Sequence, residues 1–574
     1  TLGNIAFLQR SQGSLTEALA NMEQAIGLIE ELRSLAPSGE LRQTFFSTVQ
    51  DRYQFYIELL MQLHQQNPDR GYDALAFHAS ERSRARTLLE LLREANADIR
   101  QGVDPELVAE ERRLQQKLDA AETRRLEIFG DDNSTRTQKE NIEAELAELL
   151  EQYEEIRARI RAASPRYAAL TQPQPLTLVD VQQQVVDEET VLLQYSLGEE
   201  SSYLWVVTPT EMTVHELPGR EEIEAKADDF LYAITSVTRR DNPRWVNAAA
   251  RELSEMILQP AADHLQKKRL LISADGILQN IPFSALTISR GEDYEPLIEQ
   301  YEIVRSPSAS AIAQIRQDTA SRTPATKTLA VFADPVFTPD DERVKTPVAA
   351  TPPDELLLAA IPEPRGETRD AVDGWARLEY TRTEAETILG LVPETESTAA
   401  FDFDANLEAI LNSEELQDYQ IIHFATHGFA NGRNPALSGL VFSLIDEGGN
   451  WQNGYLRLND IFNLNLPAEL VVLSACQTAL GRDLKGEGMV GITRGFMYAG
   501  SPRLVASLWF VDDLGTSVLM SKFYQKILSE NLSPVEAMRS AQLEMLASSE
   551  YNSPYYWAGF TFQGEWNDSA VRGE

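Results

Sequence analysis

One cysteine and one histidine of this sequence have the types and surroundings of a nucleophile and its base. Cys476 is the only cysteine among 574 residues, and it lies in VVLSACQTALG, directly after an apolar run. His427 lies in IIHFATHGFA, also directly after an apolar run, 49 residues before the cysteine. A thiol becomes a useful nucleophile when a neighbouring imidazole stabilises its thiolate. The pattern therefore predicts a His–Cys dyad, with an inert core thiol as the alternative.

Two neighbours of His427 extend this prediction. Gly428 has no side chain, so its backbone N–H can approach an oxyanion together with the N–H of Cys476. His423 lies four residues before His427, which raises a metal site as an alternative. A His-x-x-x-His pair on a strand lacks the helical context of a zinc site and has no third ligand nearby. We therefore expect no metal, and we expect His423 to pack against the dyad or to orient it.

Parallel strands are the elements that must position these residues. Apolar runs of five to nine residues recur along the second part of the sequence, at 190–197, 201–209, 269–273, 301–305, 327–333, 419–425, 437–443, 469–475 and 502–509. Continuous Val, Ile and Leu runs are typical of parallel strands that are covered on both faces. Helical patterns intervene, as in TRTEAETILGLV and GEGMVGITRGFMYAG, which predicts an open α/β sheet. Functional groups gather at the carboxyl ends of the strands in such a sheet.

The first 165 residues have a helical pattern instead. GSLTEALANMEQAI has the small-residue spacing of the second half of a tetratricopeptide repeat. Two long amphipathic helices are predicted within residues 41–97. Residues 105–163 alternate charge with a Leu/Ile/Ala stripe and break at 130–133, which predicts a helical hairpin or short coiled coil. Thr1 lies within a predicted helix, so we expect the sequence to be part of a longer chain with further repeats.

Composition limits the partners and the compartment. Lys and Arg total 51 against 89 Asp and Glu, for a net charge of −38. This acidity disfavours direct nucleic-acid binding, which depends on basic residues that neutralise phosphates. No apolar run approaches the roughly 18 residues of a membrane span. A single cysteine excludes an internal disulfide and fits a reducing compartment, so we expect a cytoplasmic protein that does not bind membranes.

Several longer motifs resemble one known family. They are ERSRARTLLELL, DGILQNIPFSAL, HFATHG, LSACQTALG, GEGMVGITRGFMYAGSPRLVASLWFVDD and SPYYWAGFTFQG. With these motifs the sequence resembles the CHAT domain ("caspase HetF associated with TPRs"), a branch of the caspase–separase clan of cysteine peptidases.

The resemblance implies an α/β caspase-like fold in two halves, each a mostly parallel sheet with flanking helices, preceded by an all-α region. The implied domains are a TPR-like helical region at 1–100, a helical hairpin or coiled-coil linker at 101–165, a pseudo-caspase-like half at 166–324 and a catalytic half at 325–574.

The resemblance also implies His427 as general base and Cys476 as nucleophile. In the related separases, the acid of an LWxVxD segment reads a basic P1 side chain of the substrate. The matching residue of LWFVDD is Asp513, with Asp512 beside it. Both residues also open a predicted helix, where an acidic residue caps the N-terminus and pairs well with the helix dipole. Both roles stay open, since one acid can cap while the other faces a pocket.

The sequence thus predicts a cysteine endopeptidase that needs no metal or organic cofactor. Its substrate would be a protein or peptide with a basic P1 residue, and a regulatory protein partner would bind the N-terminal helices. The alternative is a catalytically silent TPR–CHAT signalling scaffold that binds partner proteins. The proline-rich polar segment 338–376 carries Arg343, Lys345 and Arg365. It is a candidate processing loop.

Overall fold

The computed structural model describes most of the chain. The described residues are 2–35, 39–84, 92, single positions and pairs between 104 and 124, 135–163, 175–289, 294–320, 322–345, 375–411, 413–429, 438–475, 481–484 and 488–567. None of the helices in these ranges combines the length and the apolar composition that crossing a membrane requires.

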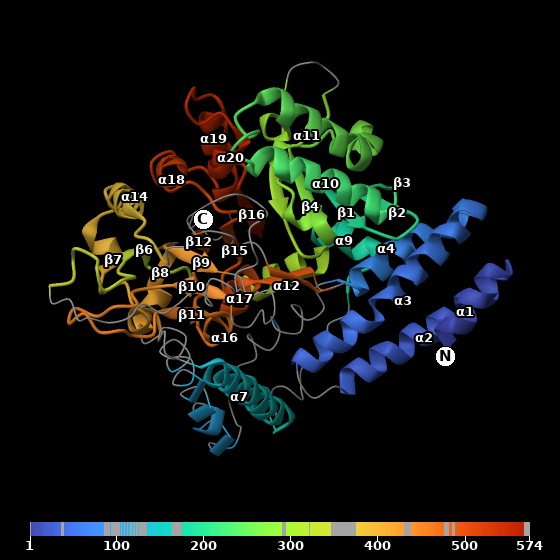
Figure 1. Cartoon of the computed structure of the whole chain (residues 1–574). Helices are drawn as coiled ribbons and strands as arrows, with labels where there is room; N and C mark the ends of the chain where they lie inside the picture. The colour runs from blue at the N-terminus through green and yellow to red at the C-terminus, as the bar shows by residue number, and fades with distance from the viewer. Residues whose placement is uncertain are drawn as a thin grey trace.

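The chain begins with helices that pack in sequence order (Figure 1). These are α1 (Leu2–Ser11), α2 (Leu15–Leu35), α3 (Gly39–Gln66) and α4 (Tyr72–Arg82), with the short 3-10 helix η1 (Pro68–Arg70) before α4. Gly13 makes the turn between α1 and α2 with φ +81°, a conformation that favours glycine. Ala18 and Met22 of the repeat-like motif are fully buried in α2, so the small-residue spacing does form a packing face.

The helical region is joined to the sheet by two buried charged residues at the end of α4. The carboxylate of Glu81 accepts hydrogen bonds from the backbone N–H of Ser310, over 2.9 Å, and from its hydroxyl, over 2.6 Å. Ser310 lies in the first turn of α12 (Ala309–Thr319), where helical N–H groups lack intrahelical partners. Arg84 donates a hydrogen bond to the carbonyl oxygen of Ala274, over 2.9 Å. The motif ERSRARTLLELL therefore begins with residues that attach the helices to the α/β region.

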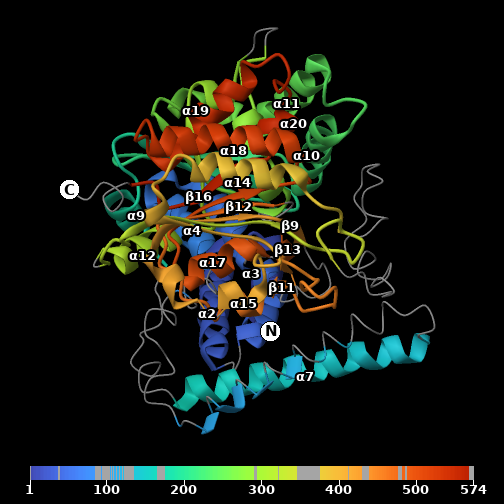
Figure 2. The same cartoon turned by 90° about the vertical axis from the view of Figure 1, so that its left-hand side faces the viewer.

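A long helix, α7 (Arg136–Ala163), has a separate small core of its own. Ile142, Leu146 and Tyr153 on its buried face pack with Leu114 and Ala121 from the preceding segment. Figure 2 shows α7 running beside the main body, near the N-terminal helices.

Within the described residues, eleven strands form one continuous sheet, in the order β3-β2-β1-β4-β5-β16-β15-β12-β8-β6-β7. The strands are β1 (Thr190–Ser196), β2 (Ser202–Val207), β3 (Met212–Leu217), β4 (Arg269–Ser273), β5 (Glu302–Arg305), β6 (Lys327–Pro335), β7 (Ser397–Asp402), β8 (Tyr419–Ala425), β12 (Leu470–Ser474), β15 (Arg503–Ser507) and β16 (Phe560–Gly564). Only the pairs β1–β2, β2–β3 and β15–β16 are antiparallel. The expected caspase-like class, a mostly parallel sheet with flanking helices after a helical region, is confirmed.

The two halves of the sheet meet where β5 pairs in parallel with β16. The register there places Val304 opposite Phe562 and Arg305 opposite Gln563. The predicted boundary between the halves, at 324–325, falls between the end of α12 and the start of β6. Because β16, the last of the described strands, closes this seam, the two halves share one sheet.

Helices cover both faces of the sheet (Figure 2). One face carries α10 (Arg220–Thr235), α11 (Pro243–Ile257), α14 (Glu379–Leu389), α18 (Asp513–Leu528), α19 (Pro534–Leu546) and α20 (Pro554–Trp557). The other described α-helices are α9 (Leu178–Gln184), α15 (Leu407–Leu411), α16 (Leu458–Ile461) and α17 (Ile492–Ala499). Short 3-10 turns are η2 (Gln259–His264), η3 (Gly276–Asn280), η4 (Phe283–Ala285), η5 (Leu297–Glu299), η7 (Glu394–Glu396) and η8 (Glu414–Asp418).

Smaller sheets flank the main one. β9 (His427–Phe429), β10 (Gly439–Val441) and β11 (Tyr455–Arg457) form one, and β13 (Gly481–Leu484) pairs with β14 (Gly488–Gly491). Two segments form other elements than those predicted from the sequence. GEGMVGITRGFMYAG is helical from Ile492, and its described residues Gly488–Gly491 form β14 instead, because glycine costs about 1 kcal/mol in a helix relative to alanine. The run 437–443 contributes β10 to the small sheet rather than a strand to the main one.

One buried ion pair joins the strands that lead to the candidate site. Glu469 and Arg503 lie just before β12 and at the start of β15, and their side chains are 2.7 Å apart and buried. We expect Glu469→Ala to lower the free energy of unfolding by about 3–5 kcal/mol, because it leaves the buried Arg503 charge unpaired. Urea unfolding monitored by circular dichroism checks this. Glu469→Gln, which retains a hydrogen-bond acceptor, is the control and should lose less; equal losses would contradict the charge argument.

Candidate active site

Three parallel strands end together at the edge of the sheet that carries His427. β8 lies between β6 and β12, and the register pairs Ala425 of β8 with Ala333 of β6 and with Ser474 of β12. His427 follows Ala425 by two positions and begins β9. Cys476 follows Ser474 by two positions in the sequence, but it lies outside the described residues. His427 is therefore at the expected edge, and the position of the thiol stays a prediction.

The His427 imidazole is held between two aromatic rings and a backbone carbonyl. Its ring centroid lies 4.9 Å from that of Phe337 and 5.0 Å from that of Trp375. Its Nε2 is 2.7 Å from the carbonyl oxygen of Ala376. A carbonyl only accepts hydrogen bonds, so this contact assigns the ring proton to Nε2. In the neutral ring, Nδ1 is then the nitrogen that is free to accept a proton.

The surroundings of His427 keep it neutral. Burial lowers the pKa of His427 to about 4, while the hydrogen bond to Ala376 acts in the opposite direction. At neutral pH the imidazole is therefore uncharged and can serve as a base through Nδ1. In the Ser-His-Asp triads a carboxylate orients the imidazole. Here a backbone carbonyl occupies the corresponding place, a contact that the sequence analysis missed because every residue type has a carbonyl.

His427 is the first residue of the small three-stranded sheet. Gly428 follows it in β9, is buried, and pairs with Leu440 of β10. The indole N–H of Trp375 donates a hydrogen bond to the hydroxyl of Tyr455 in β11, over 3.2 Å, and this bond fixes the indole ring. The sheet that contains His427 thus also holds one of the rings that flank it. The role of Gly428 in an oxyanion hole stays a prediction.

The two acidic residues of LWFVDD have different contacts. Asp512 is the N-cap of α18, and its Oδ1 accepts a hydrogen bond from the backbone N–H of Gly515, over 2.8 Å. The Oδ2 of Asp513 instead accepts a hydrogen bond from the backbone N–H of Tyr380, over 3.0 Å. Tyr380 lies in the first turn of α14. Asp512 is therefore the helix cap, and Asp513 connects the starts of α18 and α14.

Asp513 is surrounded by other carboxyl groups. Its pKa is raised to about 6, first by burial and then by the charges of Glu384, Asp512 and Glu379, against the hydrogen bond from Tyr380. A half-buried carboxylate among like charges favours a cation beside it. Among the described residues, no lysine or arginine ion-pairs with Asp513.

His423 lies in the interior of the sheet, four residues before His427. Its Nδ1 is 3.0 Å from the hydroxyl of Tyr524 on α18, and its Nε2 is 2.8 Å from Oε1 of Glu384 on α14. His423 and Glu384 are both almost completely buried. These contacts connect β8 with the two helices whose N-termini meet at Asp513. They do not involve His427, so an orienting role of His423 in the dyad stays a prediction. Within the described part of the chain, no group of three or more acidic, histidine or cysteine side chains could hold a metal ion.

A cluster of charges that the sequence analysis missed lies next to these residues. Asp334, near the end of β6, has its side chain fully buried and a left-handed backbone with φ +50°. Arg343, Arg377 and Arg382 all form ion pairs with it, at N–O distances of 2.9–3.1 Å. The signal available in the sequence was only an acidic residue at a strand end, in VFADP.

One of these arginines belongs to the candidate processing loop. The guanidinium of Arg343 pairs with Asp334, Asp341 and Asp402. Its side chain is therefore engaged inside the protein rather than presented to a protease. Lys345 is exposed, and Arg365 lies outside the described residues.

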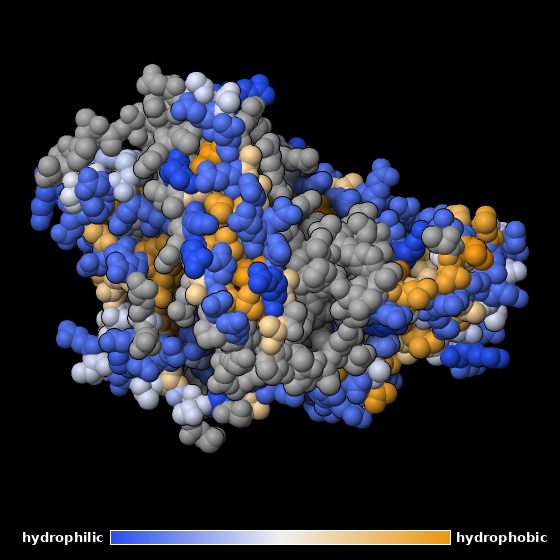
Figure 3. All heavy atoms as spheres, turned by 90° about the horizontal axis from the view of Figure 1, so that it is seen from below, coloured by the Kyte–Doolittle hydropathy of each residue, from blue (hydrophilic) through white to orange (hydrophobic). Residues whose placement is uncertain are grey.

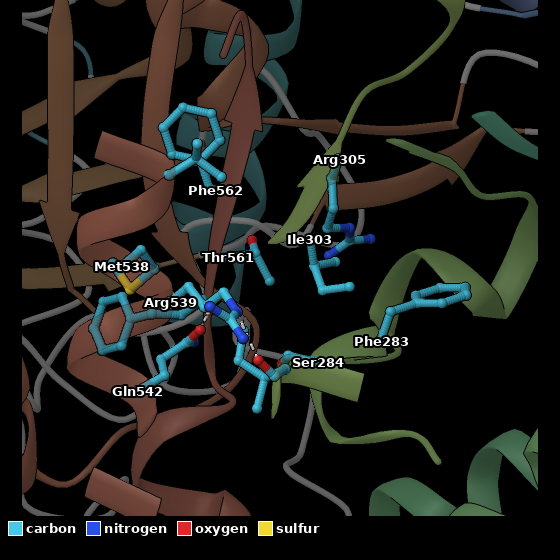
Figure 4. A pocket seen from close by; sticks show the side chains of 12 residues that line it. Phe283, Ser284, Ile303, Arg305, Met538, Arg539, Gln542, Thr561 and Phe562 are labelled. Atoms are coloured by element: carbon cyan, nitrogen blue, oxygen red, sulfur yellow. Dashed lines mark hydrogen bonds between the residues drawn. The ribbon is translucent and has the colours of Figure 1, made fainter. Parts of the chain in front are cut away.

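A small pocket lies at the seam between the two halves of the sheet (Figure 4). Side chains from η4, β5, α19 and β16 line it. Two of its polar groups are already bonded: Arg539 donates to the carbonyl oxygen of Ile298, and Gln542 donates to that of Phe560. Neither His427 nor Asp513 lines this pocket, so it is distinct from the candidate site.

Comparison with known families identifies the α/β region. The CHAT domain model matches residues 247–565, more than half of the chain. The chain belongs to the CHAT domain family. The matched residues include His427, Cys476 and Asp513.

Similar proteins are related to this CHAT protein over limited lengths. Tetratricopeptide repeat protein 28 of Homo sapiens is 23% identical over 372 residues, which is 58% of this chain and 14% of that protein. The Mus musculus protein of the same name is 33% identical over 109 residues, 19% of this chain and 4% of its own. The chain thus spans only a small part of these curated relatives.

Two solved structures are similar in fold. The Saccharomyces cerevisiae separase–securin complex matches with a TM-score of 0.42 and 10% identity, covering 98% of this chain and 46% of that chain. The Arg-specific cysteine proteinase gingipain R matches with a TM-score of 0.33 and 11% identity, covering 60% and 74%. At these identities the likeness concerns the fold alone.

The acidic environment of Asp513 leads to a titration experiment. We expect its carboxyl group to titrate near pH 6, and Glu384→Gln to lower this pKa, because the charge of Glu384 raises it. Carboxyl ¹³C NMR across the acidic range measures the change. Glu386→Gln removes an exposed charge from the same helix and is the matched control. The electrostatic explanation is wrong if the pKa of Asp513 is the same in Glu384→Gln and the wild type.

Proposed function

We propose that this CHAT protein is a cysteine endopeptidase with His427 as general base and Cys476 as nucleophile. The observation that carries the proposal is the neutral imidazole of His427 at the carboxyl edge of the sheet, whose Nε2–H donates a hydrogen bond to the carbonyl oxygen of Ala376. This arrangement leaves Nδ1 as the basic atom. It is the protonation state that a general base must have before the reaction begins.

The chemistry follows the usual course of thiol peptidases. Nδ1 of His427 takes the proton of the Cys476 thiol, and the thiolate sulfur attacks the scissile carbonyl carbon. The backbone N–H groups of Gly428 and Cys476 stabilise the resulting oxyanion. The imidazolium then gives its proton to the leaving amine as the C–N bond breaks, which leaves a thioester. Water, deprotonated by His427, hydrolyses the thioester, and the proton returns to the sulfur.

We further propose that Asp513 binds a basic P1 side chain. The carboxylate is half-buried among Glu384, Asp512 and Glu379, and these like charges raise its pKa. A lysine or arginine side chain would relieve that repulsion and form a charge-assisted hydrogen bond. The remaining lone pairs of Asp513 would take this bond, since one oxygen already accepts from Tyr380.

The N-terminal helices supply the proposed surface for a regulatory protein. Figure 3 shows apolar side chains on the end of the molecule where the first helices project. Ile5, Phe7, Leu8 and Leu28 of α1 and α2 are exposed. An exposed apolar patch rimmed by polar residues is typical of a protein contact. The same surface is what the alternative function, a silent scaffold, would use, so the patch favours partner binding without separating the two functions.

The dyad is tested by comparing three variants. We expect Cys476→Ala and His427→Gln to abolish cleavage of Arg-P1 and Lys-P1 reporter peptides, because one lacks the nucleophile and the other the base. His264→Gln, a histidine of the other half of the sheet, should retain wild-type activity. Cleavage of lysate proteins, with mapping of the new termini, provides a second measurement. Identical termini from the wild type and Cys476→Ala, with and without candidate activating partners, would favour the scaffold.

The role of Asp513 is tested through pH. Protonation of Asp513 removes its charge, so we expect KM for an Arg-P1 peptide to rise as the pH falls through about 6. A citrulline-P1 peptide, which is neutral, should lack this dependence. Asp513→Asn should lower kcat/KM for Arg-P1 by about tenfold to hundredfold, the loss expected for a charge-assisted hydrogen bond of about 1.5–3 kcal/mol. An unchanged preference for Arg over citrulline would exclude this role.

A further inference from the structure

The peptide group that contacts His427 lies in a segment that has no helix or strand to fix it. Residues 375–378 precede α14 and have no regular secondary structure. The carbonyl of Ala376 must nevertheless stay 2.7 Å from Nε2 of His427. A side chain next to Ala376 on each side provides the restraint. The side chain of Trp375 is hydrogen-bonded to that of Tyr455, and the side chain of Arg377 is hydrogen-bonded to that of Asp334.

The contact between Arg377 and Asp334 has the geometry of a paired, two-point interaction. Nε of Arg377 donates to Oδ1 of Asp334 and Nη2 donates to Oδ2, each over 2.9 Å. Such a bidentate pair fixes direction as well as distance, which a single hydrogen bond does not. The side chain of Asp334 is completely buried. The anchor for Arg377 is therefore rigid and excluded from water.

We propose that Arg377 is a positioning residue for the peptidase reaction, with its paired contact to Asp334 holding the Ala376 carbonyl against Nε2 of His427. The inference rests on the proposed function in that His427 must be the base. The clamp, meaning the Asp334–Arg377 pair, acts through the carbonyl and does not touch the substrate. Its loss would free the carbonyl to move and leave the Nε2–H of His427 without a fixed acceptor.

The other arginines at Asp334 do not perform this task. Arg382 bonds through Nε to Oδ2 of Asp334 and pairs with Asp402, but it lies within α14, six residues from Ala376. Arg343 lies 33 positions before Ala376 in the sequence and also pairs with Asp402. Both compensate the buried charge of Asp334. Only Arg377 is adjacent in sequence to the orienting carbonyl.

The groups around His427 make the consequence measurable. Its described contacts are the rings of Phe337 and Trp375 and the carbonyl of Ala376, and none of these carries a charge. The carbonyl contact raises the pKa of His427, against burial, which lowers it. Losing the contact should thus lower the pKa of His427 further. It should also allow the ring proton to distribute between Nε2 and Nδ1.

The experiment compares Arg377→Ala and Arg377→Lys with Arg382→Ala, which removes an ion pair to the same carboxylate from a different position. Kinetics with an Arg-P1 peptide separates kcat from KM. Histidine ¹⁵N NMR, with His427 assigned through His427→Gln, reports which ring nitrogen carries the proton. We expect Arg377→Ala to lower kcat by about 10²-fold at nearly unchanged KM, the order of loss for a misplaced catalytic group. Arg377→Lys should be intermediate, because lysine cannot pair with both oxygens.

The outcomes separate the clamp from the proposed function. A mixed tautomer of His427 in Arg377→Ala, with wild-type behaviour in Arg382→Ala, supports the clamp even if no peptide is cleaved. Equal losses of kcat in Arg377→Ala and Arg382→Ala overturn it, because a general effect of the charge cluster then explains both. Wild-type kcat and an unchanged Nε2 tautomer in Arg377→Ala also overturn it. If Arg377→Ala does not fold, kcat and the tautomer of His427 are compared between Arg377→Lys and Arg382→Ala instead, with the same criteria.

Discussion

A carboxylate removed from water costs several kilocalories per mole unless cations surround it, and Asp334 is removed from water completely. This constraint organises the carboxyl edge of the part of the sheet that carries His427. Arg343 precedes residues 346–374 in the sequence, and Arg377 and Arg382 follow them. All three arginines pair with the side chain of Asp334. The chain on both sides of that segment is therefore drawn to the same end of β6. The left-handed backbone at Asp334 is retained because the ion pairs stabilise it.

Much of the framework could be predicted from local patterns. The apolar run 419–425 forms β8, and the run 469–475 contains β12. The two strands are neighbours in the sheet, and hydrophobic runs with strand–helix alternation leave few other arrangements. The placement of His427 at a strand end follows from the same pattern. The resemblance to the CHAT domain was also correct. These predictions share one basis, because burial and periodicity can be recognised within short stretches of sequence.

The contacts that tune the site could not be predicted in the same way. The orienting carbonyl of Ala376 has no residue-type signal, and Arg377 is 43 positions from Asp334. Asp513 could be recognised as a helix-start residue, but its partner is the backbone N–H of Tyr380, from a helix far back in the chain. The pairing of His423 with Glu384 likewise joins a strand to a distant helix. Long-range geometry decides each of these interactions, and it depends on the whole sheet being formed.

The contact of Glu81 with the first turn of α12 limits how this architecture can be rearranged in evolution. Glu81 is fully buried and bonded to Ser310, so the helical region ends in a group that the α/β region needs to complete one of its own helices. A domain joined only by a linker can be exchanged by recombination at little cost. Here an exchange between the helical region and the sheet would break the buried hydrogen bonds of Glu81 and separate the packed rings of Phe77 and Trp205, which belong to one core. The unit of inheritance is thus the sheet together with the N-terminal helices that share its core, including α3, whose Gln54 accepts a hydrogen bond from Ser196 of β1.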